Sequence, residues 1–241
     1  MEEGGRRDLS RGRRSGGRRD RAAVTYILRG TPVRGRRRKA KTEKPRASLT
    51  LGEEAALPIE AVTFSFLDTE TTGLSSSRGG RVCELAILRV RGGKAVDSFQ
   101  ELIDPQVPIE FGAQAVHGIT DSMVRGKPTF RALSPRVAKL LEGTVMVCHN
   151  APFDEAFLRA EFERSGGAMP EIPILCTLKL ARRHFSFERN NLGTIAQALG
   201  VETRGWHRAG ADVAMLDKIF RYFLKEFSMR GASTLGELVD L

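Results

Sequence analysis

The sequence predicts an α/β domain in which a mixed five-stranded sheet carries helices on both faces. Two observations lead to this fold class. Strand-type segments at 61–68, 82–90 and 95–103 follow one another closely, and the short turn at 91–94 predicts an antiparallel meander. Helical and strand-type segments then alternate in the second half of the chain, which favours parallel pairing there.

The later elements follow from local patterns. Pro105 and Pro108 interrupt the third strand pattern, and Gly200 ends a helical segment. The last helix carries apolar residues at helical spacing, as an amphipathic helix does. Predicted strands lie at 144–148 and 172–176, and predicted helices at 129–142, 152–165, 177–184, 191–199 and 208–227.

The start of the chain differs in composition from the rest. Residues 1–48 contain 17 Lys or Arg and 5 Asp or Glu, a net charge of +12, whereas the remaining residues carry 22 basic and 24 acidic groups. A segment rich in Arg and Gly with few large apolar residues cannot bury enough surface to offset its ordering entropy. We expect residues 1–55 to be a disordered basic tail and residues 56–241 to form the folded domain.

The basic tail has two interpretations of similar weight. It can be an arm that binds nucleic-acid phosphates by counterion release, without reading sequence. It can equally be a misassigned start of translation, a solubility tail or a transit peptide, although a transit peptide is usually poorer in acids.

No segment predicts a membrane partner or secretion. No apolar run approaches the roughly 18 residues of a membrane span, and no apolar core follows the basic start as in a signal peptide. The three cysteines, an odd number, lie in apolar runs and are typical of buried free thiols in a reducing compartment. We therefore expect a cytoplasmic protein.

Two acids, Asp68 and Glu70, directly follow the apolar run 62–67. In a strand, residues two apart point to the same face, which would hold the two carboxylates roughly 6.6 Å apart at about 3.3 Å per residue. A divalent cation such as Mg²⁺ prefers carboxylate oxygens and would offset their repulsion. Taken alone, the pair fits a strand that runs into a polar turn equally well.

Two further acids occur at predicted helix starts. Asp154 ends the segment His149–Asp154, which follows a short strand-type run at 145–148. Asp212 lies at the start of the last predicted helix, so its carboxylate would project from the first turns.

His207 precedes Asp212 by five residues. On a helix this step separates two side chains by about 140°, so both cannot be helical and converge. We expect His207 to lie on the preceding loop, between Gly205 and Gly210. An imidazole that titrates near neutrality suits the role of a proton acceptor for water.

With these motifs in order, the chain resembles the DEDD exonucleases in their histidine variant, the family that includes the proofreading ε subunit of bacterial DNA polymerase III. The resemblance covers about residues 60–228 and includes the intervening segments 116–120, 176–182 and 191–196. It implies the ribonuclease H-like fold for the predicted sheet.

The resemblance implies hydrolysis of phosphodiester bonds at the 3′ end of nucleic acid, releasing nucleoside 5′-monophosphates with two Mg²⁺ or Mn²⁺ ions. By this resemblance Asp68 bridges the ions, and Glu70 and Asp212 complete one metal site. Asp154 supports the second ion, and His207 deprotonates the attacking water. The residues predicted to bind the substrate are Thr71, Leu74, His117, Ile119 and Asn150.

The pair Thr71-Thr72 after Glu70 looks more like the DNA-proofreading branch of the family than like its RNA-degrading branch. This resemblance implies a DNA substrate, as a single-stranded or frayed 3′ end in proofreading or repair. DNA and RNA share the phosphate, and discrimination requires contacts to the 2′-OH, so an RNA-trimming exoribonuclease of the same superfamily stays open. A non-catalytic nucleic-acid-binding adaptor that depends on its basic tail is the alternative from another class. The short segment Ala232–Leu241 favours a free-standing exonuclease, with DNA polymerase association through another surface left open.

Overall fold

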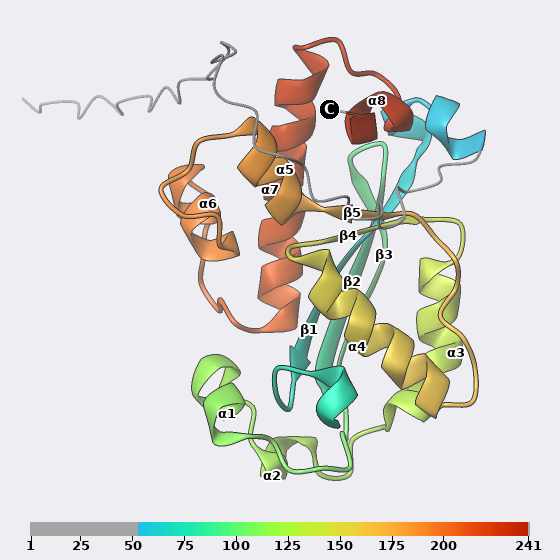
Figure 1. Cartoon of the computed structure of the whole chain (residues 1–241), viewed down its shortest axis with the longest axis vertical. Coiled ribbons are helices and arrows are strands. Elements are labelled where there is room, and N and C mark those ends of the chain that lie inside the picture. The colour runs from blue at the N-terminus through green and yellow to red at the C-terminus, as the bar shows by residue number, and fades with distance from the viewer. Residues whose placement is uncertain (1–52, 241) are drawn as a thin grey trace, which may run out of the picture.

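The computed structural model describes residues 53–240 and contains a five-stranded sheet of order β3-β2-β1-β4-β5 (Figure 1). The central strand β1 pairs antiparallel with β2 and parallel with β4. The predicted meander and the predicted mixed sheet are both confirmed. The strands are β1 (Thr63–Thr71), β2 (Val82–Arg91), β3 (Lys94–Leu102), β4 (Val145–Cys148) and β5 (Ile174–Cys176).

Eight α-helices surround the sheet in the described residues. Five of them match predicted helices to within about two residues at each end, whereas the short α1, α2 and α8 were not predicted. The helices are α1 (Phe111–His117), α2 (Asp121–Val124), α3 (Phe130–Leu141), α4 (Ala151–Arg164), α5 (Thr177–His184), α6 (Leu192–Ala198), α7 (Ala209–Ser228) and α8 (Leu235–Asp240), and the 3₁₀ turns are η1 (Glu53–Ala56), η2 (Ile59–Ala61) and η3 (Ser76–Arg78).

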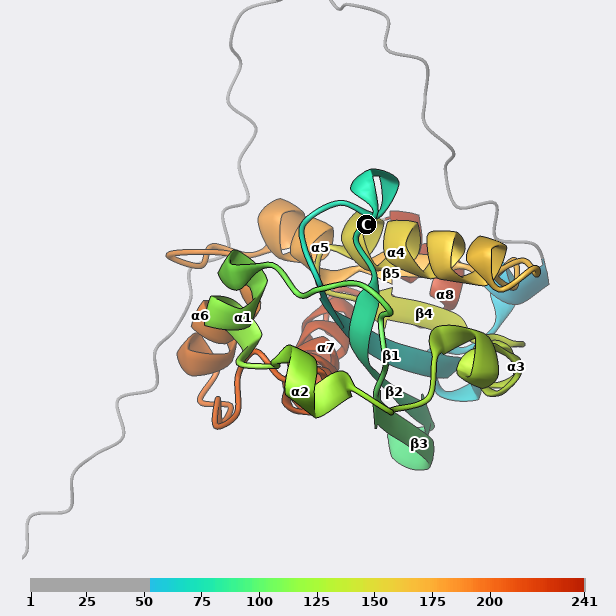
Figure 2. The same cartoon turned by 90° about the horizontal axis from the view of Figure 1, so that it is seen from below.

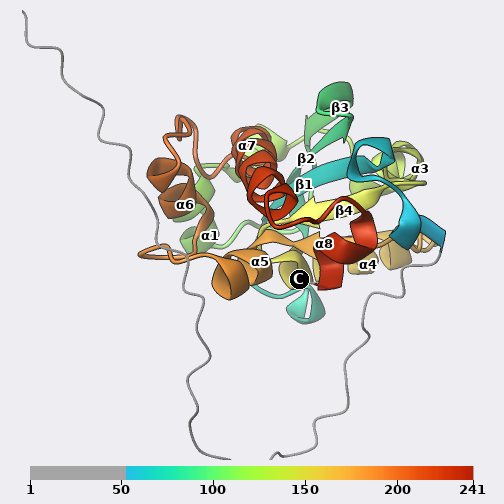
Figure 3. The same cartoon turned by 90° about the horizontal axis from the view of Figure 1, so that it is seen from above.

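Helices cover both faces of the sheet (Figure 3). On one face, Phe64 and Phe66 of β1 contact Phe220 of α7 edge to face, with ring centroids 5.1 and 5.5 Å apart. On the other face, Leu67 packs in a cluster with residues of α3 and α4. Successive residues of a strand point to opposite faces. Asp68 and Glu70 therefore point toward α7, on the same face of β1 as Phe64 and Phe66.

The strand β1 is longer than the predicted 61–68. It continues through Glu70, which pairs with Glu84 of β2, and ends at Thr71 after a register shift. The β-branched Thr69 and Thr71 suit a strand, so pairing persists past the apolar run. Both predicted acids of the first motif therefore lie within the strand, and the polar turn starts after them.

The unpredicted helices α1 and α2 lie beyond the end of β1 (Figure 1) and are toward the viewer when the molecule is seen from below (Figure 2). Glu110, before α1, donates its backbone N–H to the Thr72 carbonyl at 2.9 Å. At the other end of α1, His117 Nε2 contacts the Thr71 carbonyl at 3.2 Å. The helix is thus held against the end of β1 by tertiary hydrogen bonds, which a local sequence pattern does not reveal.

The described residues begin with a turn that contacts the C-terminal helix. The backbone N–H of Leu235 donates to the Leu57 carbonyl at 3.0 Å, and Ile59 donates to the Ser233 carbonyl at 3.0 Å. The predicted boundary between residues 55 and 56 falls inside η1, and the predicted tail up to residue 52 lies outside the described residues. Cys83, Cys148 and Cys176 are free and buried. Within residues 53–240, no helix is both long and apolar enough to span a membrane.

Candidate active site

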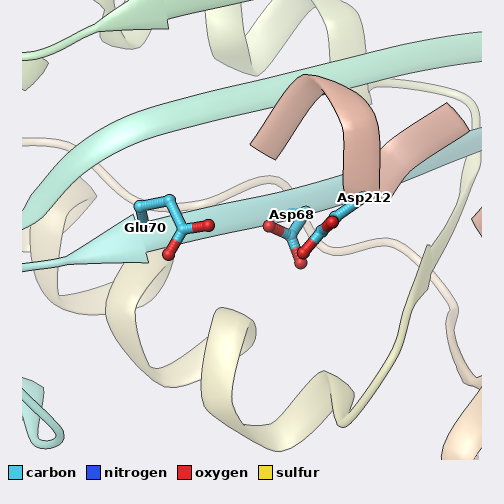
Figure 4. Close-up of side chains that lie close together, drawn as sticks. All are labelled: Asp68, Glu70 and Asp212. Atoms are coloured by element: carbon cyan, nitrogen blue, oxygen red, sulfur yellow. The ribbon is translucent and has the colours of Figure 1, made fainter. Parts of the chain in front are cut away.

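Three carboxylates from two elements meet on the α7 face of the sheet. Asp68 and Glu70 come from β1, and Asp212 comes from the first turn of α7 (Figure 4). One oxygen of each lies within 4.8 Å of the others. The packing of Phe64 and Phe66 on Phe220 places α7 over β1, and this brings together acids that are 142 to 144 positions apart in the sequence.

Burial and mutual repulsion disfavour the ionised form of these acids. The pKa of Glu70 is raised to about 8, mainly by burial and then by the charges of Asp212 and Glu84. Burial likewise raises the pKa of Asp212 to about 7. The pKa of Asp68 lies well above its ordinary value because of burial and then the Asp154 and Asp212 charges.

The donor set fits a hard divalent cation. Three carboxylate oxygens in reach of one another are the ligands that Mg²⁺ and Mn²⁺ prefer. A cation would offset the repulsion that contributes to the three raised pKa values. The charge of Arg208 lowers the pKa of Glu70, but its effect is smaller than that of the neighbouring acids. Asp68, Glu70 and Asp212 are the residues that would hold it.

Asp154 lies beside this cluster on another element. It sits in the first turn of α4, and its Oδ1 accepts hydrogen bonds from the Thr69 backbone N–H at 3.1 Å and the Thr69 hydroxyl at 2.9 Å. Burial raises the pKa of Asp154 to about 7, against the Thr69 hydrogen bonds that lower it. Asp154 is outside the three-acid cluster, but its charge is the strongest that acts on Asp68. All four predicted acids therefore occupy one region.

His207 lies on the loop before α7, where the five-residue spacing predicted it. Its backbone N–H donates to Asp212 Oδ1 at 3.3 Å, and its imidazole stacks on Trp206 with centroids 4.5 Å apart. Burial lowers the pKa of His207, so the imidazole is neutral near pH 7 and can accept a proton. Its φ of 67° is a left-handed value that non-glycine residues adopt rarely.

The five predicted substrate-binding residues divide into two groups. Leu74, 88% exposed, and Asn150, also exposed, are accessible to a ligand. Asn150 has a φ of 73°, so two of the three non-glycine residues with positive φ in the described part are predicted site residues.

The other three are buried and support the turn after β1. The Thr71 hydroxyl donates to the Gly73 carbonyl at 2.8 Å. His117 Nδ1 accepts the Ile119 backbone N–H at 3.0 Å, and Ile119 is fully buried beside Cys83. Their contact with a nucleotide stays a prediction.

A buried acid that the sequence reasoning missed organises the start of α7. Glu84, 1% exposed, accepts hydrogen bonds from Arg208 Nε at 3.0 Å and Nη2 at 2.8 Å, and from the Ala209 backbone N–H at 3.1 Å. Gln100 Nε2 adds a fourth at 3.1 Å. Burial raises the pKa of Glu84, but these hydrogen bonds outweigh it and the net pKa is lowered.

Glu84 thereby caps α7 from a neighbouring strand, since Arg208 at the N-cap makes no capping bond with its own side chain. A Cβ on Gly210 would overlap the Gln100 amide, which would then have to move. A single acid in the apolar run Val82–Ile87 is the sequence signal that could have identified Glu84.

Comparisons with known proteins show to which family the chain belongs. A family model described as "Exonuclease" matches residues 65–220, more than half of the chain. The chain is 35% identical over 198 residues to a DNA polymerase III subunit epsilon-like protein of Rhodobacter capsulatus, covering 78% of this chain and 28% of the relative. It is 35% identical over 185 residues to a DNA polymerase III PolC-type protein of Lacticaseibacillus paracasei, covering 76% of this chain and 13% of the relative. The chain thus spans less than a third of either relative.

Solved structures show the same fold. An exonuclease X complex with 5′ overhanging duplex DNA aligns with a TM-score of 0.52 and 29% identity, over 66% of this chain and 92% of that one. A zinc-bound complex of Escherichia coli exonuclease I with single-stranded DNA aligns with a TM-score of 0.61 and 20% identity, over 68% of this chain and 43% of that one. The fold, the carboxylate cluster and the matching family model together place this chain in the family of DEDD-type 3′–5′ exonucleases.

Proposed function

We propose that the protein is a divalent-metal-dependent 3′–5′ exonuclease that removes nucleoside 5′-monophosphates from single-stranded or frayed 3′ ends of DNA. The observation that carries this proposal is the meeting of Asp68, Glu70 and Asp212 within 4.8 Å. By the resemblance described above, these acids, on a strand and a helix far apart in sequence, correspond to motif positions of the family.

Each residue has a role in this proposal. Asp68, Glu70 and Asp212 hold one cation, and Asp154 helps to hold a second. Bound divalent ions stabilise the attacking and leaving oxygens of an in-line displacement at phosphorus. His207, neutral near pH 7, accepts the proton of the attacking water.

DNA is the favoured substrate. The relatives named above are DNA polymerase III components by name, and exonuclease X was solved with duplex DNA. Leu74 and Asn150 are the exposed side chains proposed to contact the terminal nucleotide. Association with a DNA polymerase, suggested only by the relatives' names, and a cytoplasmic location complete the proposal.

The direct test uses purified protein and oligonucleotides of one sequence, made as DNA and as RNA and labelled at the 5′ end. With Mg²⁺ or Mn²⁺ we expect a ladder of DNA shortened from the 3′ end, and none with EDTA. Asp68→Asn should remove the activity, whereas Asp97→Asn, which changes an exposed acid on β3, should keep it.

The alternatives predict other results in the same assay. Degradation of RNA alone would overturn the DNA assignment in favour of an RNA-trimming enzyme. Binding of either polymer by a folded protein without degradation would support the adaptor. Nuclease activity retained in Asp68→Asn would show that the proposed carboxylates do not carry it.

A further inference from the structure

The imidazole of His207 is held by ring stacking and not by hydrogen bonds of its own within the described residues. Within the described residues, neither ring nitrogen makes a hydrogen bond, and only the backbone N–H of His207 is bonded, to Asp212. A catalytic base is usually oriented by a third group that hydrogen-bonds its second nitrogen. Here the partner of the ring is the indole of Trp206, whose plane lies 15° from that of the imidazole.

Trp206 is itself supported by a neighbouring helix. Its indole packs against the apolar cluster between the sheet and α7, and its backbone N–H donates to the Thr203 carbonyl at 3.1 Å. The six-membered ring lies over Gly193 of α6 so closely that a Cβ on Gly193 would come within 2.6 Å of three of its carbon atoms. Real Cβ contacts are not that short, and a rigid ring cannot fold away from the added atom.

We infer that Trp206 is a positioning residue for His207, and that the bare backbone of Gly193 is the surface on which it rests. Stacking leaves both imidazole nitrogens free, one of them for the proton of the attacking water. The position of the ring then depends on where α6 supports the indole. This inference rests on the proposed function, because it assigns His207 the role of base.

Gly193→Ala tests, by a change outside the site, whether the packing of Trp206 on α6 positions His207. Alanine is a better helix former than glycine, so the change favours α6 itself, while the new methyl group displaces the indole. A displacement of about 1 Å in a catalytic geometry costs on the order of 100-fold in rate. We therefore expect kcat for a single-stranded oligonucleotide to fall by about 10- to 100-fold, with KM changed by less than about 3-fold because the exposed side chains proposed to contact the substrate, Leu74 and Asn150, are not changed.

Two further variants separate positioning from general damage. Trp206→Phe keeps a stacking face but lacks the distant ring atoms that lie over Gly193, so it should lose less activity than Gly193→Ala. Combined in one protein, the two changes should restore kcat toward that of Trp206→Phe, because the smaller ring leaves room for the methyl group. Gly167→Ala is the matched control, since a Cβ there meets no atom within 4 Å.

Tryptophan fluorescence reports the same contact without any catalysis. Trp206 is the only tryptophan in the sequence, so emission arises from this site alone. We expect Gly193→Ala to shift the emission to longer wavelength as the indole moves toward water. His207→Ala should change the emission intensity by removing the stacked ring, and Gly167→Ala should leave the spectrum as in the wild type.

The two readouts distinguish the possible failures. A wild-type protein without nuclease activity would overturn the proposed function, whatever the fluorescence shows. An active wild type whose Gly193→Ala variant has shifted emission but unchanged kcat would overturn the positioning role alone. Unchanged emission in both Gly193→Ala and His207→Ala would overturn the stacking arrangement itself.

Discussion

Glu84 on β2 lies directly opposite Glu70 on β1 in the antiparallel pairing, yet the two carboxylates differ in their partners. Arg208, Ala209 and Gln100 donate four hydrogen bonds to Glu84, which lowers its pKa, whereas burial raises the pKa of Glu70 to about 8. The charge of Glu84 is thus balanced by Arg208 within the protein, and Glu84 supports the start of α7. The carboxylate of Glu70 remains available to a divalent cation.

Removing the partner of Glu84 should destabilise the fold. Arg208→Met leaves a buried carboxylate without its guanidinium, and we expect the free energy of unfolding to fall by about 2–3 kcal/mol. Chemical denaturation measures this change. The double variant with Glu84→Gln should recover part of the loss, because the buried charge is then also gone. Strictly additive losses would contradict the pairing.

Neutralising the centre of the carboxylate cluster should have the opposite effect on the metal-free protein. Asp68→Asn removes an ionisable carboxyl group whose pKa is well above its ordinary value, and should raise the free energy of unfolding by about 1–2 kcal/mol. It should also abolish the increase in Tm that Mn²⁺ causes in the wild type. Thermal unfolding with and without Mn²⁺ measures both effects, with Asp97→Asn as the control, and a full Mn²⁺ response in Asp68→Asn would refute the ligand assignment.

The stability of the metal-free protein should fall as pH rises from about 7 to 8. The folded pKa values of Glu70, Asp154 and Asp212 are raised to about 8, 7 and 7, so in this window the folded state binds more protons than the unfolded state. The stability that these groups contribute is complete below their unfolded pKa values near 4 and is lost as pH passes through the folded values.

Denaturation at several pH values in EDTA measures this loss. The four histidines oppose this trend below about pH 7, because their lowered folded pKa values leave them neutral in the folded state while the unfolded state still binds protons there. Their contribution fades between about pH 7 and 8, where they are mostly neutral in both states. Glu70→Gln should flatten the profile, and added Mg²⁺ should stabilise more strongly at the higher pH, where protons compete less with the cation. Stability that increases between about pH 7 and 8 in EDTA would contradict the raised pKa values.

Thr69 should matter through its hydroxyl. Both the backbone N–H and the hydroxyl of Thr69 donate to Asp154 Oδ1, so Thr69→Val keeps the shape but removes one donor. One hydrogen bond to a charged group contributes about 1.5 kcal/mol, and we expect kcat to fall by about 10-fold. Thr69→Ser should retain most of the rate, and Thr63→Val, the same change at the start of β1, should be silent. Equal activity of Thr69→Val and wild type would exclude this role.

The basic tail should act on DNA binding through charge. Deleting residues 1–52 removes the excess of basic groups and leaves η1 intact against α8. If the tail binds phosphates, the slope of log K against log salt for single-stranded DNA should become shallower by about 0.7 for each phosphate that is no longer neutralised. Fluorescence anisotropy at several salt concentrations measures the slope, and an unchanged slope would leave the tail with no part in binding.

The sequence alone determined the elements that depend on local pattern. The apolar run before Asp68, the helical spacing after Asp212 and the alternation of helix and strand predicted the sheet and its main helices. It also predicted the candidate site, because four acids and a histidine in recognisable contexts mark their own positions. These features are encoded by neighbours within a few residues.

Only the tertiary structure decided which side chain balances the charge of buried Glu84 beside the site and which residues pack against the His207 imidazole and its Trp206 support. Glu84 and Arg208 are 124 positions apart, and Gly193 meets Trp206 only because α6 packs beside α7. The same holds for α1, which is too short to show a clear helical period in the sequence and is held by hydrogen bonds to the end of β1. Contacts between distant segments depend on how the faces of the sheet and helices pack, and no local period in the sequence records that packing.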